Sequence, residues 1–306
     1  MAYKQRVTAR RRKLYDQSVF VILTIVSTFA ILVLGAVGGF LLLNAYPAFS
    51  QVDQWQFFTG TVWDPTNPIE PLYGMLPLLV ATLVVSAISA LIAIPIGLGA
   101  TIYLSEIAHP RIRKIMKPAV EVLAGIPSVV LGFFALTVFA KFVWDLFYPA
   151  WRPDDYLNMF NGAVFLAIMM VPIMVSLSED AMNSVPRSLK EASLALGMTR
   201  WETTWKVVIP AARPGIVAAI MLSIGRAVGE TMVVVMATGS APQLTWNPFS
   251  SGQPITSTIA IEMGEVAANT PHYYVLFELG LVLFVITFAL NYVADWAMRK
   301  YSERYQ

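Results

Sequence analysis

Six long apolar stretches are the feature that most limits what this chain can fold into. They cover approximately residues 18–44, 73–105, 119–141, 162–183, 212–238 and 275–298. A helix needs about 20 mostly apolar residues to cross a bilayer, and each stretch is long enough. The chain is 57% hydrophobic and only 13% charged, which is typical of membrane-span bundles. We therefore predict an all-α integral membrane protein with six transmembrane helices.

Proline and glycine interrupt several of these stretches. Examples are Pro95 in the second, Gly125 and Pro127 in the third, and Pro172 in the fourth. Such residues are tolerated in a membrane helix where neighbouring helices or cavity water satisfy the freed backbone groups. The pattern favours a bundle that forms a pathway.

Lysine and arginine are distributed unequally between the connections. Eighteen of the 21 lie in the N-terminal segment 1–17, in 106–118, in 187–213 and in the C-terminal segment 299–306. The alternate connections contain only Lys141 and Arg152, and the loops 45–72 and 239–274 contain neither residue type. Because basic connections remain in the cytoplasm, we expect both termini and the segment 187–213 to be cytoplasmic, and the first span to be retained.

The cytoplasmic segment 188–213 has the pattern of a capped helical hairpin. Ser188 is followed three residues later by Glu191, and Thr199 by Glu202, which is the spacing of two capping boxes. Gly197 lies between them, where a left-handed residue is able to end a helix. We expect helix, tight turn and helix at the membrane surface.

The external loop 239–274 contains an apolar segment, residues 254–268, that predicts a short helix. Two interpretations are open: a re-entrant piece that gates a pathway or contacts an external partner, or a helix that lies in the membrane interface.

One basic residue remains inside a predicted span. Arg226 lies about a dozen residues into the fifth stretch, followed at i+4 by Glu230. An arginine there costs about 3 kcal/mol or more, so it should face the bundle interior or a water-filled cavity. Glu230 would share its helical face and lie within ion-pair reach. Either the two form a buried structural pair, or the guanidinium binds an oxyanion in the pathway and Glu230 orients it.

The third stretch contains Gly125-Ile126-Pro127-Ser128. This sequence breaks a helix and would direct free backbone N–H groups and the Ser128 hydroxyl into the pathway, which suits an anion. A simple kink that shapes packing is the alternative.

Several chemistries lack their residues. There is no cysteine, and His109 and His272 are predicted to be solvated loop residues. No phosphate-binding G-x-x-x-x-G-K-[ST] sequence occurs, so we expect no ATP site, no metal site and no catalytic residue in this chain.

The hairpin resembles the EAA loop of ABC-transporter permeases. The match consists of Glu191-Ala192-Ser193, Gly197 and Ile209-Pro210, with Ser193 in place of the usual alanine. The resemblance implies a type I permease (MetI-like) fold. It also implies that the hairpin 187–206 docks on a separate ATPase, with Glu191, Ala192, Ser193, Leu196, Gly197, Thr199 and Glu202 as coupling residues.

Three further sequences, GRAVGETM at 225–232, LAGIPSVVLGFF at 123–134 and YLSE at 103–106, resemble the phosphate-specific permeases, and most of all the PstC type. The resemblance covers roughly 73–298, the predicted permease domain. It implies that Arg226 and Glu230 take part in phosphate translocation, and we add Ser128, Gly125 and Thr231 as candidate pathway residues.

The same resemblance implies the partners and the location. We expect a second, PstA-type permease subunit, two PstB-type subunits that bind ATP and Mg²⁺, and an external PstS-type phosphate-binding protein, in a bacterial cytoplasmic (inner) membrane. The chain would form half of the pathway. Alternatives are a permease for another oxyanion (sulfate, molybdate or phosphonate), a secondary anion transporter, or a signalling subunit.

Overall fold

The computed structural model describes residues 2–147 and 155–302. Within these residues six helices are long and apolar enough to cross a membrane, as predicted. They are Gln17–Gln51, Leu76–Ile107, Ser128–Asp145, Met159–Asn183, Arg200–Val228 and Pro271–Trp296. Arg152 and residues 303–306, on which part of the orientation argument rests, lie outside the described residues.

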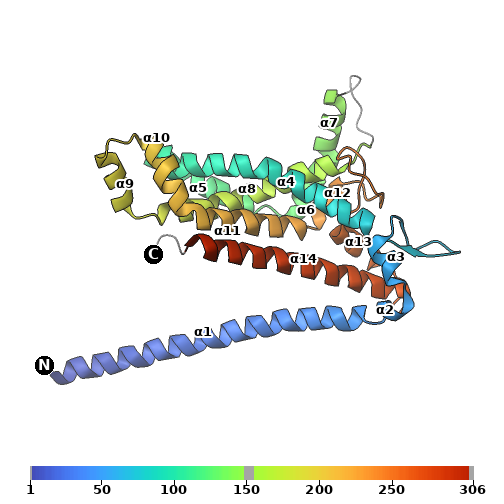
Figure 1. Ribbon diagram of the computed structural model, residues 1–306, viewed down its shortest axis with the longest axis horizontal. Helices are drawn as coiled ribbons and strands as arrows, with labels where there is room; N and C mark the ends of the chain where they lie inside the picture. Colours follow the sequence, from blue (N-terminus) through green and yellow to red (C-terminus); the bar gives the residue numbers. More distant parts are fainter. Residues whose placement is uncertain (1, 148–154, 303–306) are drawn as a thin grey trace.

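Helices make up almost all of the regular structure (Figure 1). The elements are α1 (Ala2–Ala45), α2 (Ala48–Gln51), α3 (Gln54–Thr59), β1 (Trp63–Asp64), β2 (Leu72–Tyr73), α4 (Leu76–Ile102), η1 (Tyr103–Ile107), α5 (Pro110–Ala124), α6 (Ser128–Phe134), η2 (Ala135–Phe139), α7 (Ala140–Phe147), α8 (Met159–Asn183), α9 (Arg187–Ala195), α10 (Arg200–Thr203), η3 (Thr204–Val208), α11 (Ile209–Val228), α12 (Met232–Ala237), α13 (Ile255–Glu262) and α14 (Pro271–Ser302). The strands β1 and β2 form one short antiparallel hairpin.

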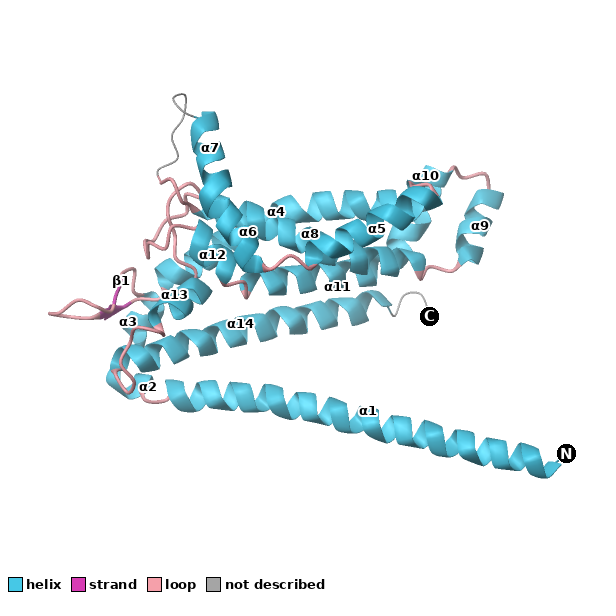
Figure 2. Ribbon diagram, turned by 180° about the vertical axis from the view of Figure 1, so that it is seen from behind, coloured by secondary structure: helices cyan, strands magenta, loops and turns pink. Residues whose placement is uncertain are grey.

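The two ends of the bundle differ in what they carry. Helices α9 and α10, the start of α1 and the end of α14 lie at one end, whereas β1, α3 and α13 lie at the other (Figures 1 and 2). The hairpin and the outer ends of the first and last long helices thus share one end of the bundle.

The core lies between α4, α8 and α11. Buried small and branched residues from these helices, including Val84, Ala93, Ala163 and Leu166, form its largest cluster. Gly215 of α11 lies so close to α8 that an added Cβ would be 2.4 Å from the Ala181 methyl group. Small residues therefore allow these backbones to approach closely, as is usual in membrane bundles.

Helix α1 is peripheral. Phe40 contacts Phe277 of α14 with ring centroids 5.8 Å apart, and from there the two helices diverge (Figure 2). None of the apolar window of the first span is buried inside this chain, so its surface is left to lipid or to another subunit. The helix also begins earlier than predicted, because it includes the basic segment 1–17.

Two predicted spans are interrupted. The third is broken at Gly125–Pro127, as the Gly-Ile-Pro sequence indicated, and α6 begins at Ser128. The fifth was predicted to run over 212–238, which is wrong: α11 ends at Val228, and the separate helix α12 begins at Met232. Three π-helical turns, η1, η2 and η3, lie within or at the ends of spans.

The segment 254–268 contains α13, whose residues Ile255, Thr256, Ser257 and Thr258 are all buried. The backbone N–H of Ile255 donates to the Thr82 hydroxyl of α4 (3.0 Å). These contacts support the re-entrant interpretation, because a helix in the membrane interface would not have its first turn enclosed by the bundle.

Candidate functional site

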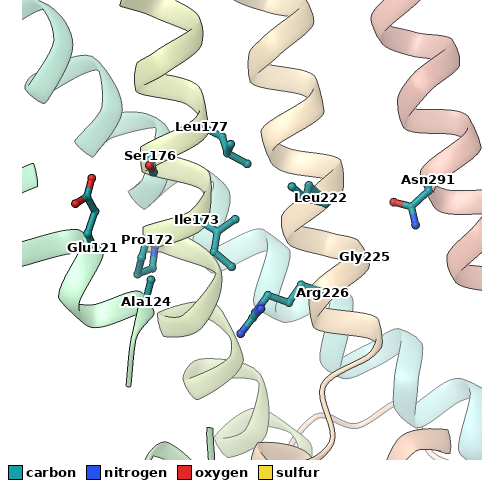
Figure 3. Close-up of a pocket in the computed structure, with 10 residues that line it drawn as sticks. All are labelled: Glu121, Ala124, Pro172, Ile173, Ser176, Leu177, Leu222, Gly225, Arg226 and Asn291. Carbon is teal, nitrogen blue, oxygen red and sulfur yellow. The ribbon is translucent and has the colours of Figure 1, made fainter. Parts of the chain in front are cut away.

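A cavity lies where α5, α8, α11 and α14 face one another (Figure 3). Its volume is about 690 Å³, within the usual range for a small-molecule site. The lining residues are Glu121, Ala124, Pro172, Ile173, Ser176, Leu177, Leu222, Gly225, Arg226 and Asn291. Most are apolar, and the polar groups are few.

Arg226 is in the last turn of α11, and its side chain enters this cavity (Figure 3). The guanidinium extends toward Pro172 and Ala124. Pro172 lies inside α8, and Ala124 is the last residue of α5 before the break. The prediction that a membrane-embedded arginine faces a cavity is therefore confirmed. Arg226 is exposed in the isolated chain, so its charge is open to whatever enters.

The predicted pairing of Arg226 with Glu230 is wrong. Because α11 ends at Val228, Glu230 does not continue its helical face. The Glu230 carboxylate instead accepts from the backbone N–H of Met232 (3.2 Å) at the start of α12. Its carbonyl accepts from the Thr256 hydroxyl of α13 (2.7 Å). Glu230 therefore connects α12 to α13, and no ion pair joins it to Arg226 among the described residues.

The other predicted pathway residues are not among the residues that line this cavity. Gly125 ends α5 immediately after the lining residue Ala124. Ser128, the first residue of α6, is half-buried. The Thr231 hydroxyl donates to the Gly229 carbonyl (3.4 Å) in the connection to α12. Their predicted contact with substrate stays a prediction.

Sequence reasoning missed three polar lining residues. Glu121, Ser176 and Asn291 come from α5, α8 and α14 and face the same cavity as Arg226. Glu121 stands one turn before the Gly-Ile-Pro break, and this position is the only sequence signal for it. Nothing local marks Ser176 or Asn291, because their position depends on how the helices pack.

In the hairpin, one of the two predicted capping boxes is present. Thr199 and Glu202 cap α10 reciprocally: the Glu202 N–H donates to Thr199 Oγ1 (3.2 Å), and the Thr199 N–H donates to Glu202 Oε2 (3.0 Å). The Ser188 box is wrong, because α9 begins at Arg187 directly after Pro186. Ser188 is therefore already inside the helix.

Gly197 has the predicted left-handed backbone (φ +86°) between α9 and α10. The two helices are locked by Ser193, which is buried and whose hydroxyl lies 2.9 Å from the Thr203 hydroxyl. This contact explains how the hairpin accommodates serine where the EAA pattern has alanine. The hairpin also presents apolar side chains to solvent: Leu196 is 85% and Trp201 56% exposed. Glu191 and Ala192 are exposed beside them.

Ion pairs connect α5 and the hairpin to the spans. Lys190 of α9 pairs with Glu106 of η1 (2.7 Å). Glu179 of α8 has a fully buried side chain and pairs with both Arg113 and Lys117 of α5. Lys117 also pairs with Asp180 (3.2 Å). Burial lowers the pKa of Lys117, but its hydrogen bonds and the charges of Glu179 and Asp180 outweigh burial and raise that pKa overall.

His109 is an exposed loop residue, as predicted, whereas the same prediction for His272 is wrong, because His272 lies in α14 with its side chain largely buried. His109 accepts from the Arg111 N–H at the start of α5 (3.3 Å). His272 is in the first turn of α14, and its Nε2 lies 2.7 Å from a carboxylate oxygen of Glu262. Glu262 also accepts from the Trp63 indole N–H (3.0 Å). Glu262 thereby joins the segments 45–72 and 239–274.

A family model described as "Binding-protein-dependent transport system inner membrane component" matches residues 93–306. A phosphate transport system permease protein PstC of Mesorhizobium japonicum is 33% identical over 97% of this chain and 94% of its own length. A probable ABC transporter permease protein YqgH of Bacillus subtilis is 38% identical over 76% of this chain and 74% of its own. PstC 1 of Mycobacterium tuberculosis is 34% identical over 80% and 82%.

Two solved structures share the fold. A chain of the MetNI methionine ABC transporter in an inward-facing conformation superposes with a TM-score of 0.59 at 21% identity, covering 74% of this chain and 97% of that one. A chain of a bacterial alginate ABC transporter superposes with a TM-score of 0.59 at 15% identity, covering 85% and 88%. These similarities confirm the MetI-like helical arrangement predicted from the hairpin.

Proposed function

This chain belongs to the family of binding-protein-dependent transport system inner membrane components, and from that membership we propose that it is the permease subunit of an ATP-driven importer of inorganic phosphate. Several relatives that span most of the chain carry the name of phosphate transport permease. Family members are multi-pass inner-membrane proteins that work with an ATPase and a binding protein.

The observation that carries the proposal is the position of Arg226 in the cavity between α5, α8, α11 and α14. A guanidinium is charged at every physiological pH and presents a planar fork that binds two oxygens of a tetrahedral oxyanion. The apolar wall around it, including Ile173 and Leu222, weakens screening by water and strengthens that attraction. The Ser176 hydroxyl and the Asn291 amide supply neutral hydrogen-bond donors.

The cavity is incomplete in one chain, which supports the assignment of half a pathway. Glu121, Ala124, Leu222 and Arg226 line it and are nevertheless exposed. We assign the missing wall to a second, PstA-type permease subunit. A site formed between two subunits opens and closes when they rock against each other, so binding there is transient and high affinity is left to the external PstS-type protein.

The hairpin 187–206 is the contact with the ATPase. Its exposed apolar residues, headed by Leu196, would enter a groove of one PstB-type subunit, and Glu191, Ala192, Gly197, Thr199 and Glu202 shape that surface. Ser193 holds the hairpin rigid from inside. ATP and Mg²⁺ are held by the two ATPase subunits, since this chain has no phosphate-binding loop of its own.

The proposed cycle is alternating access with both termini in the cytoplasm. The binding protein delivers phosphate at the external loops 45–72 and 239–274. Closure of the ATPase pair moves the hairpin, and η3 and α11 continue from α10 directly toward Arg226. Phosphate passes the guanidinium and leaves on the cytoplasmic side.

The test is ATP-driven uptake of radiolabelled phosphate into proteoliposomes that contain the assembled complex. Arg226→Gln should reduce the uptake rate at least tenfold while assembly with the ATPase is retained. Arg226→Lys keeps the charge but loses the planar fork, so it should recover only part of the rate.

Glu230→Gln is the matched comparison, because Glu230 connects α12 to α13 and makes no ion pair with Arg226 among the described residues. It should alter complex stability more than phosphate KM. Normal uptake by a well-assembled Arg226→Gln complex would exclude the arginine from the pathway. If the complex transports sulfate, molybdate or phosphonate but not phosphate, the phosphate assignment is wrong and the assignment as a permease stands.

A further inference from the structure

A second cavity lies along the cytoplasmic half of α5. Its volume is about 440 Å³, and its lining residues are Ala108, Pro110, Arg113, Lys114, Lys117, Pro118 and Glu121. Glu121 also lines the cavity that contains Arg226. The two cavities therefore meet at one carboxylate, and the route from Arg226 toward the cytoplasmic end of α5 passes it.

The lining follows a single face of α5. Positions 110, 113, 114, 117, 118 and 121 recur at helical spacings of three and four, and position 124 extends the same row into the first cavity. One helix face thus carries a carboxylate at the junction and three cations beyond it. Because these cations lie along one helix face and line one cavity, they are arranged to bind an anion along that face rather than scattered over a basic surface.

Two of the cations are held in place from behind. Arg113 Nε donates to Glu179 Oε1 (2.8 Å), and Lys117 lies 3.1 Å from Glu179 Oε2. The Glu179 side chain is fully buried, so this carboxylate sits behind the cations and does not line the cavity. Arg113 and Lys117 therefore keep N–H groups for a ligand on the open side.

Lys114 is the third cation, and its side chain is exposed in the cavity. It makes no ion pair within the part of the chain that the structure describes. Because Glu179 and Asp180 offset part of the positive charge of Arg113 and Lys117, the net attraction of the cavity for an anion is moderate. A ligand is able to bind there and still leave.

Building on the proposed function, we propose that this cavity is a second oxyanion site that binds a phosphate group at the cytoplasmic end of the pathway. Arg113, Lys114 and Lys117 supply the donors. Glu121 separates this site from Arg226 and opposes return of the anion. The phosphate group has two possible sources, free phosphate in transit and the headgroup of an anionic lipid, and the experiment separates them.

The test measures acetylation of lysines by an amine-reactive reagent in the assembled complex, read by mass spectrometry. Lys114 is compared with Lys141, which is exposed on α7, outside both cavities and outside the hairpin. Inorganic phosphate is compared with chloride at matched ionic strength, in lipid-free detergent and in vesicles with or without phosphatidylglycerol. We expect phosphate to slow acetylation of Lys114 at least threefold in detergent and to leave the acetylation rate of Lys141 unchanged.

Protection of Lys114 by phosphate in detergent supports a site for the free ion, whereas protection that needs phosphatidylglycerol assigns the site to a lipid headgroup. If phosphate slows acetylation of Lys114 no more than that of Lys141 under every condition, the proposal is overturned. In uptake assays, Lys114→Gln should slow phosphate release several-fold relative to Arg111→Gln, a neighbour outside the cavity lining.

The two proposals fail in different ways. A wild-type complex that transports no phosphate rejects the proposed function, while the acetylation result still decides the cavity. Normal uptake with unprotected Lys114 rejects only the second site.

Discussion

The ammonium group of Lys190 lies 2.7 Å from a carboxylate oxygen of Glu106, and both side chains are largely buried (25% and 14% exposed). The contact fastens α9 of the hairpin to η1 at the end of the second span. In the proposed cycle, a displacement of α9 would therefore reach α4 as well as α11. The second span would then receive the ATPase movement directly.

Removing this contact should uncouple ATP hydrolysis from transport. Lys190→Gln and Glu106→Gln should each lower the phosphate transported per ATP, and the double variant should be little worse than either single one. Partners in one ion pair share a coupling energy on the order of 1 kcal/mol. The ratio of uptake rate to ATPase rate is measured for the wild type, both single variants and the double variant, and it gives the coupling energy between the two residues. Strictly additive losses would contradict the predicted coupling.

Glu179 should be the most sensitive acidic residue for stability. Glu179→Ala removes the fully buried carboxylate that Arg113 and Lys117 share, although these two cations are themselves 35% and 33% exposed. Losing hydrogen bonds between charged groups of this kind costs about 1.5–3 kcal/mol. Asp180→Asn alters a carboxylate that is 63% exposed, and it should cost about 0–1 kcal/mol. Thermal unfolding of the purified complex compares the two, and similar losses would show that burial of Glu179 does not matter.

The hairpin offers a paired test of capping. Thr199→Ala removes the cap of α10 and should destabilise the hairpin by about 1 kcal/mol. Ser188→Ala should have almost no effect, because Ser188 lies inside α9. The affinity of the permease for the isolated ATPase subunit, measured by titration, should fall only for Thr199→Ala. A loss of affinity for Ser188→Ala instead would mean that Ser188 does cap α9.

Glu121 should contribute to the choice between oxyanions. Hydrogen phosphate carries an O–H group that is able to donate to a carboxylate, whereas sulfate at neutral pH has none and is only repelled. Glu121→Gln should therefore reduce the ratio of phosphate to sulfate uptake several-fold. Ser176→Ala, a neutral change in the same cavity, should slow both anions equally, and an unchanged ratio in Glu121→Gln would remove Glu121 from selectivity.

The spans and the hairpin were predictable because their signals are local. A run of apolar residues, the sequence Gly125-Ile126-Pro127 and the Thr199–Glu202 spacing each act within a few turns of chain. The capping prediction failed at Ser188 because the Ser-x-x-Glu spacing does not specify the first residue of the helix. Pro186 precedes that first residue, Arg187, so Ser188 is already inside α9. The end of α11 was also missed, since 225–238 is apolar throughout apart from Arg226, Glu230 and two threonines.

That break depends on contacts distant in sequence. Thr256 of α13 bonds the Glu230 carbonyl, and Glu230 in turn caps α12. Glu121 and Asn291 were missed for the same reason, because four helices must pack before their side chains meet Arg226. Glu179 reads as one acidic residue at the end of an apolar stretch, and only the position of α5 reveals its two cationic partners.

The π-helical turn η3 (Thr204–Val208) has a geometric consequence for how a push at the membrane surface reaches the middle of the bilayer. A π turn holds one residue more than an α turn, and each residue of an α-helix advances the side chains by about 100° around the axis. If η3 tightens into an α turn, everything beyond it swings through that angle relative to the hairpin. A linear displacement of α9 and α10 would then be converted into a rotation of α11 about its axis. This rotation would turn the Arg226 side chain toward or away from the cavity.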